Sequence, residues 1–210
     1  MTIAVASPVH GQAGNTTNAI LIALLLAETQ NKKVCLTHLS ANNTDIFEYL
    51  GADRLSDKTC TPSQVAKLLK VGTLTPRDIP TYCLPISENL DIFSNTGDNT
   101  KSEDLEAVQD FLLKENPYDF LVVDVDVNLS SAIAKNALEK SGVVVVSLKQ
   151  SHNVLVRHKS RETDAFVLKS LFIYSYYNYP RFDARRRREK RYVERQWRDS
   201  SRPAFSLGVD

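Results

Sequence analysis

Residues 2–17 read TIAVASPVHGQAGNTT, an apolar segment followed by a loop with two glycines, and the apolar run 19–27 comes next. This order predicts a buried strand, a loop and the N-terminus of a helix. Backbone N–H groups at such a junction bind phosphate. Phosphate loops usually end in Gly-Lys-Ser/Thr, whereas here Asn15 stands at the lysine position and Val9 at the first glycine. The stretch therefore predicts the shape of a phosphate loop without all of its charge.

Strand-like and helix-like patterns alternate along the rest of the chain, which indicates a parallel sheet with right-handed crossovers. The runs 121–123 and 143–146 are continuously apolar, as strands covered on both faces are. We expect an α/β domain over residues 1–180, with a mostly parallel, twisted sheet flanked by helices in three layers. The expected strands are 2–7, 33–39, about 81–85, 90–93, 120–125, 143–148 and 171–177. The expected helices are 16–29, 45–50, 62–71, 101–115, 130–140 and about 152–167.

Two helix ends carry capping signals. Thr100 followed by Glu103 predicts a capping box for the helix at 101–115. Gly142 follows the helix at 130–140 and is predicted to be its C-cap.

Basic residues gather between Arg181 and Arg202, where ten lysines and arginines share the segment with four acidic residues. This segment has a net charge of +6, and because the whole chain is +1, the remainder is −5. We expect residues 181–210 to form a separate basic helix or tail. A helix over 184–197 would be amphipathic, with arginines around an aromatic stripe. The residues that fall together on the stripe side are Tyr192, Val193, Gln196 and Trp197.

Three roles stay open for this basic helix. It can pack on its own domain or on a protein partner, bind nucleic acid phosphates, or lie on an anionic membrane surface. The membrane role is the least favoured of the three. The candidate contact residues are Arg185, Arg186, Arg187, Arg188, Lys190, Arg191, Arg195 and Trp197.

Several features indicate a cytoplasmic protein. The first residues lack the charged region that opens a signal peptide, and the longest apolar run, 19–27, is too short to cross a bilayer. The three cysteines, Cys35, Cys60 and Cys83, are odd in number and far apart in the sequence. Their spacing predicts neither a disulfide framework nor a zinc site, and Cys35 is expected to be a small core residue.

Taken together, the motifs resemble the ParA/MinD family of deviant-Walker ATPases, which belong to the SIMIBI class of P-loop proteins. Residues 10–17, HGQAGNTT, stand where the family has Lys-Gly-Gly-Val-Gly-Lys-Thr-Thr. Residues 118–124, YDFLVVD, resemble the Walker B strand, and residues 88–95, ENLDIFSN, resemble another family strand. Residues 38–42, HLSAN, replace the family's Asp-x-Asp-Pro-Gln.

The resemblance implies a P-loop NTPase-like fold and a site for ATP or ADP with Mg²⁺, unless the altered loop binds no nucleotide at all. The implied nucleotide-binding residues are Gly11, Gln12, Ala13, Gly14, Asn15, Thr16, Thr17 and Asp124. Of these, Thr16 and Asp124 would hold the metal. The resemblance also implies a homodimer or higher oligomer that acts on a protein partner.

The departures from the family fall on its chemical positions. His10 replaces the signature lysine, Asn15 replaces the loop lysine, and Ser40 replaces the aspartate credited with activating water. A neutral amide does not replace an ammonium charge, and serine is no general base without a partner. Simpler interpretations remain: Asn15 as a helix N-cap, and His10 and His38 as a loop and a strand-end residue. We assign no catalytic residue.

The resulting expectation is a degenerate ParA/MinD-like ATPase, a pseudo-ATPase that acts as a positioning, partition or assembly scaffold by binding partners. One alternative is a slow partition-type ATPase that binds Mg-ATP and non-specific DNA. The other is a nucleic-acid-binding module in which the basic helix is carried by a dimeric α/β scaffold.

Overall fold

The computed structural model describes residues 1–7, 13–40, 46–50, 61–95, 100–125, 128–149 and 170–175. The expected helix at about 152–167 and the basic unit at 181–210 lie outside these residues, as does the expected boundary at residue 180.

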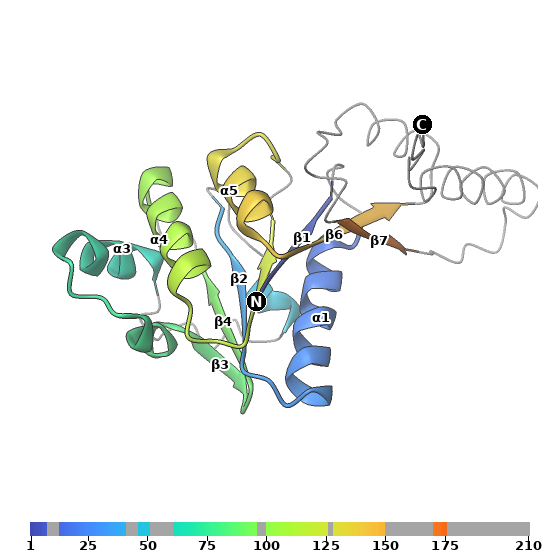
Figure 1. The fold of residues 1–210 in the computed structure, drawn as a ribbon, viewed down its shortest axis with the longest axis horizontal. Coiled ribbons are helices and arrows are strands. Elements are labelled where there is room, and N and C mark those ends of the chain that lie inside the picture. Colours follow the sequence, from blue (N-terminus) through green and yellow to red (C-terminus); the bar gives the residue numbers. More distant parts are fainter. Residues whose placement is uncertain are drawn as a thin grey trace, which may run out of the picture.

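Seven strands among the described residues form one sheet, in the order β3-β4-β2-β5-β1-β6-β7 (Figure 1). Neighbouring strands are parallel except for β3 and β4, which pair antiparallel. The sheet is therefore mostly parallel, as the sequence predicts. The strands are β1 (Thr2–Ala6), β2 (Val34–His38), β3 (Leu84–Ser87), β4 (Leu90–Ser94), β5 (Phe120–Asp124), β6 (Val143–Lys149) and β7 (Ser170–Ser175).

Helices cover both faces of the sheet and complete the three layers (Figure 1). One face packs against α1 and α2, around Val5, Leu36 and Val122. The other face packs against α3, α4 and α5, around Leu121 and Val123. The helices are α1 (Asn15–Thr29), α2 (Ile46–Tyr49), α3 (Pro62–Val71), α4 (Ser102–Glu115) and α5 (Ala132–Lys140), with a 3₁₀-helix, η2 (Pro76–Tyr82).

The sheet order brings the C-terminal ends of three strands, β1, β5 and β2, together at the centre of the sheet. β5 lies between β1 and β2, and Val5 is in register with Asp124 while Thr37 is in register with Val123. In open α/β sheets ligands bind outside this edge. Residues 7, 38–40 and 124–125 therefore meet beside the N-terminus of α1, at the place where a functional site is expected.

The strand expected at about 81–85 is present as β3, but it lies further toward the C-terminus than predicted. A 3₁₀-helix occupies Pro76–Tyr82, and β3 begins at Leu84. The cause is a capping box in which the Asp78 carboxylate accepts hydrogen bonds from the backbone N–H and the hydroxyl of Thr75. Pro76 at the first helical position, with its fixed φ, adds to this helix start.

The two predicted caps are wrong. α4 has Lys101 at its N-cap without a side-chain capping bond, and the buried Thr100 Oγ1 has no hydrogen-bond partner among the described atoms. The C-cap of α5 is Ser141, while the N–H of Gly142 donates to the Thr2 carbonyl at 3.0 Å as the chain enters β6. The left-handed glycine cap is instead Gly72, which ends α3 with φ of 73°.

Cys35 is a buried core residue, as expected, and the structure brings it beside Cys83. A hydrogen bond with the Cys83 thiol and burial raise the pKa of Cys35 well above its usual value. Both cysteines are free thiols in the apolar layer under α4. The burial of both thiols and the raised pKa of Cys35 fit a packing role.

Asp110 joins α4 to α5 and gives the first prediction. Its carboxylate pairs with Lys114 at 2.7 Å, with Lys140 of α5, and with the Asn136 amide at 3.3 Å. The two lysines hold its pKa at about 2, below the usual 3.8. Because the folded pKa is lowered, the stabilisation is complete above pH 3.8 and is lost as the pH falls through about 2.

We expect Asp110→Asn to lower the free energy of unfolding at pH 7 by about 0.5–1 kcal/mol, because the pair is partly solvated. The difference from the natural chain should disappear as the pH approaches 2. Urea titrations at pH 7, 4 and 2 measure it, with the exposed Glu139→Gln on α5 as the control. A pH-independent difference would contradict the role of the Asp110 charge.

Candidate nucleotide-binding site

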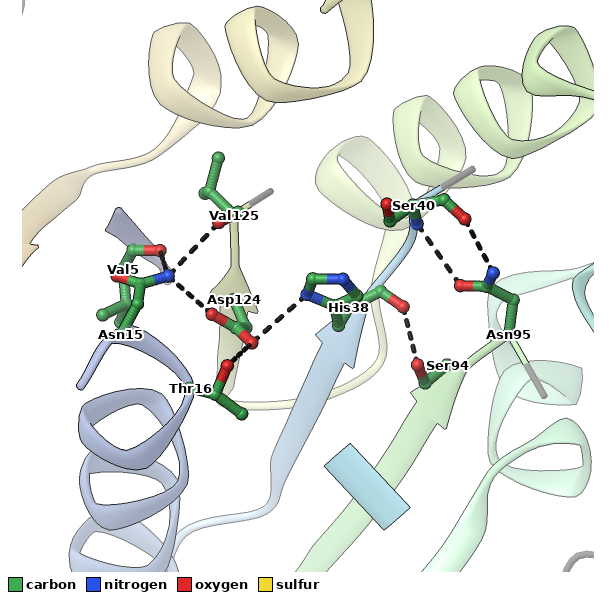
Figure 2. Close-up of polar contacts among 9 residues, drawn as sticks. All are labelled: Val5, Asn15, Thr16, His38, Ser40, Ser94, Asn95, Asp124 and Val125. Atoms are coloured by element: carbon green, nitrogen blue, oxygen red, sulfur yellow. Dashed lines mark hydrogen bonds and ion pairs between the residues drawn. The ribbon is translucent and has the colours of Figure 1, made fainter. Parts of the chain in front are cut away.

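Asp124 is the centre of the candidate site. It is the last residue of β5 and is only 3% exposed. Figure 2 shows side chains from α1 and β2 converging on its carboxylate. A buried carboxylate needs hydrogen-bond donors to remain charged, so the groups around Asp124 decide what this site can do.

Asn15, the first residue of α1, occupies one side of Asp124. Its Nδ2 atom lies 2.6 Å from Asp124 Oδ1, 3.1 Å from the Val5 carbonyl and 3.2 Å from the Val125 carbonyl. An amide has two N–H groups for these three acceptors, and Asn15 Oδ1 is buried with no hydrogen-bond partner among the described atoms. An ammonium group with three donors matches this position better than an amide does.

The interpretation of Asn15 as the helix N-cap is wrong. Gly14 is the N-cap of α1 and adopts a left-handed conformation with φ of 70°. Its carbonyl accepts the first helical hydrogen bond, from the N–H of Asn18 at 2.8 Å. A glycine takes this conformation without strain, and the turn directs the side chain of the next residue, Asn15, toward Asp124.

Thr16 and His38 contact the other carboxylate oxygen. The hydroxyl of Thr16 donates to Asp124 Oδ2 at 2.8 Å, and His38 Nδ1 lies 3.2 Å from the same atom (Figure 2). Asp124 therefore connects the start of α1 to the end of β2. The sequence indicated Thr16 and Asp124 as a pair, but His38 was interpreted only as a strand-end residue, because which strand lies next to β5 depends on the sheet order.

Ser40 is buried, and its backbone is fixed to the end of β4. Asn95 accepts from the Ser40 N–H at 3.3 Å and donates to the Ser40 carbonyl at 2.7 Å. The Ser94 hydroxyl donates to the His38 carbonyl at 2.7 Å. Asn95 and Ser94 were missed as site residues, although polar residues directly after an apolar strand were a usable signal.

The remaining predicted residues are placed only in part. Ala13 is buried beside Gly14, and Thr17 is exposed on α1. His10, Gly11 and Gln12 lie outside the described residues, as does every candidate contact residue of the basic segment. α1 is also joined to β6, where the Asn18 amide donates to the buried Ser147 hydroxyl at 2.9 Å, a contact that the sequence did not indicate.

The donors at this site fit Mg²⁺ in part. Thr16 Oγ1 and Asp124 Oδ2 are hard oxygen ligands 2.8 Å apart, a separation suited to two adjacent positions around one small cation. Among the described residues no group of three His, Cys, Asp or Glu side chains is able to hold a metal ion. Mg²⁺ would therefore need phosphate and water ligands, and it would displace His38 Nδ1 from its contact with Asp124.

Comparison with solved structures shows which fold surrounds this site. A plasmid partition protein from Borrelia burgdorferi matches with a TM-score of 0.65 and 20% identity, over 96% of this chain and 86% of that one. A plasmid partition protein structure from Borrelia burgdorferi B31, bound to AMPPNP, matches with a TM-score of 0.62 and 22% identity, over 92% and 78%. The cell division ATPase MinD from Pyrococcus furiosus gives 0.60 and 16%, over 87% and 73%.

The chain therefore has the fold of the ParA/MinD-like P-loop ATPases, as its motifs predict. No protein-family model and no curated protein matches the amino-acid sequence. Within the described part of the chain, no helix is long and apolar enough to cross a membrane.

Substitution of Asn15 tests the polar contacts at Asp124. We expect Asn15→Ala to lower the free energy of unfolding by about 1–2 kcal/mol, through lost hydrogen bonds. Asn15→Asp should cost about 3 kcal/mol or more at pH 7, because it buries a second carboxylate beside Asp124 without a counter-charge. Sharing a proton raises the folded pKa of such a pair, so the extra cost should shrink as the pH falls toward 4.

Urea denaturation of both variants at pH 7 and pH 4 measures these costs. Thr17→Asp is the matched control, because it adds the same charge at an exposed position in the first turn of α1. There a carboxylate should be neutral or slightly stabilising. Equal losses for Asn15→Asp and Asn15→Ala at pH 7 would show that Asn15 does not face the Asp124 charge.

Proposed function

We propose that this chain is a ParA/MinD-like pseudo-ATPase, a scaffold that positions, partitions or assembles a partner by binding and has no ATP cycle of its own. The carrying observation is the contact between Asn15 and Asp124, in which an amide at the loop-lysine position is held by the Walker B-like carboxylate. The scaffold would act as a homodimer or higher oligomer. Its basic segment, Arg181 to Arg202, offers a surface for an acidic protein or nucleic acid.

The electrostatics of phosphoryl transfer support the absence of hydrolysis. This reaction depends on positioning and on positive charge around the transferred phosphate. Asn15 brings no charge, and its amide is engaged by three acceptors. The loss of a cationic group from such a site lowers the rate by a factor on the order of 10³ or more, and Ser40 supplies no carboxylate to orient water.

One observation favours a second candidate, a slow partition-type ATPase. Thr16 and Asp124 keep the oxygen pair that would hold Mg²⁺ on a nucleotide. The N-terminus of α1 remains an anion-binding position because its first turn carries no acidic residue. Similar structures include a partition protein bound to AMPPNP and a MinD bound to Mg-ADP. Nucleotide binding without turnover is compatible with the scaffold, whereas turnover is not.

The deciding experiment combines thermal unfolding with phosphate release. Nucleotide-stripped protein is heated with and without millimolar Mg-ATP, and free phosphate is measured in parallel. We expect no Mg²⁺-dependent phosphate release from the natural chain. Asn15→Lys should raise the melting temperature in Mg-ATP by several degrees, because it returns a positive charge to the loop and binding to the folded state stabilises it.

Thr16→Ala and Thr29→Ala form a matched pair, since both remove a hydroxyl from α1 but only Thr16 contacts Asp124. If the natural chain shows a shift that Thr16→Ala abolishes, while phosphate release stays at background, the scaffold holds nucleotide without using it. Phosphate release that disappears in a folded Asp124→Ala variant would overturn the proposal in favour of the slow ATPase.

A further inference from the structure

α1 is apolar on every side, although only one side of it faces the sheet. Ala19, Ala23 and Ala27 are buried against the strands. Leu21 and Leu25, one turn apart, point outward and are 50% and 58% exposed. A helix that is apolar all round is typical of one covered on both sides. The outer side of α1 therefore has the composition of a covered surface.

Crossover handedness limits which part of the chain can cover α1. The crossover from β1 to β2 runs toward the β3 edge of the sheet and carries α1 on one face. The crossovers to β5 and β6 run in the opposite direction and carry α4 and α5 on the other face. Parallel crossovers are right-handed, so the β6–β7 connection, which also runs away from the β3 edge, is assigned to the α5 face.

The chain after β7 is the candidate cover for α1. It is 35 residues long, from residue 176 to residue 210, and lies outside the described residues. β7 is two strands from β1, about 10 Å at the usual strand spacing. The eight residues 176–183 reach about 26 Å when extended. They are long enough to bring the amphipathic stretch at 184–197 over α1.

The chemistry of that stretch complements the α1 face. In a helix, Tyr192, Val193 and Trp197 lie on one side and Arg191, Arg195 and Arg198 on the opposite side, while Lys190 lies one turn before Val193 on the apolar side. The segment from Arg181 to Arg202 has a net charge of +6, whereas the rest of the chain is −5. The exposed Glu28, on α1 beyond Leu25, adds an acidic group at the edge of the apolar stripe.

We propose that the C-terminal segment of this chain docks as an amphipathic helix on the outer face of α1, with Tyr192, Val193 and Trp197 against Leu21 and Leu25. Docking covers the apolar stripe and leaves the arginines of the opposite side facing solvent, as a basic ridge for a partner. α1, which carries Asn15 and Thr16 of the candidate nucleotide site, is then also the helix on which the basic segment docks. This docking is independent of nucleotide chemistry and goes beyond the proposed scaffold function.

Trp197 is the only tryptophan of the chain, so its fluorescence reports the docking in the full-length protein. In the folded protein we expect Trp197 to emit at a shorter wavelength than in the same protein in urea. We also expect its acrylamide quenching constant to be severalfold lower. The double variant Leu21→Gln/Leu25→Gln should shift the emission to longer wavelength and raise the quenching constant severalfold. Both leucines are exposed and glutamine is a good helix former, so far-UV circular dichroism should stay unchanged.

Val71→Gln is the matched control, because Val71 is 74% exposed and lies at the end of α3, which packs on the opposite face of the sheet. This substitution should leave Trp197 fluorescence unchanged. A solvent-exposed Trp197 in the natural chain overturns the proposal. So does a buried Trp197 that does not respond to Leu21→Gln/Leu25→Gln. Burial that is lost on dilution, together with a change from dimer to monomer, assigns the α1 face to a second copy instead.

Discussion

The buried carboxylate of Asp124 is the constraint on which the candidate site depends. It stands at the end of the central strand β5, where it is 3% exposed, and an unpaired charge there would be costly. Asn15 and Thr16 from α1 and His38 from β2 surround its two oxygens. These contacts fix the start of α1 against the sheet, so the position of this helix and the polar surroundings of Asp124 are linked.

The same contacts explain how the start of α1 is held in place with an amide at residue 15. Asn15 keeps a donor toward Asp124 and toward the carbonyls of Val5 and Val125, which preserves the shape of the helix start. What it does not keep is a positive charge for a phosphate. Under the proposed scaffold function, a protein that works by presenting surfaces to partners needs only this shape.

Much of the fold was predictable because hydrophobic periodicity is a local property. The apolar run 121–123 became the buried central strand β5, and the run 143–146 became β6, in which Val144, Val145 and Val146 are buried. The bounds of α3 are the predicted ones, Pro62–Val71. The errors came from short local signals at the ends of elements. Thr100 with Glu103 matches a capping box, but α4 begins after Lys101 and has no side-chain capping bond. Gly142 looked like a cap but entered β6 instead.

The sequence by itself determined the parallel α/β fold and the strand–loop–helix unit at its start, because both follow from local residue order. The pairing of Thr16 with Asp124, which lie 108 residues apart, was expected only from the family resemblance. Only the tertiary structure decided that His38 and Asn95 join this edge of the sheet, since strand order places residues far apart in sequence side by side. It also decided that Asn15 faces a carboxylate and two carbonyls, and that the leucines of α1 face outward. These features arise from packing between distant segments, which no local pattern encodes.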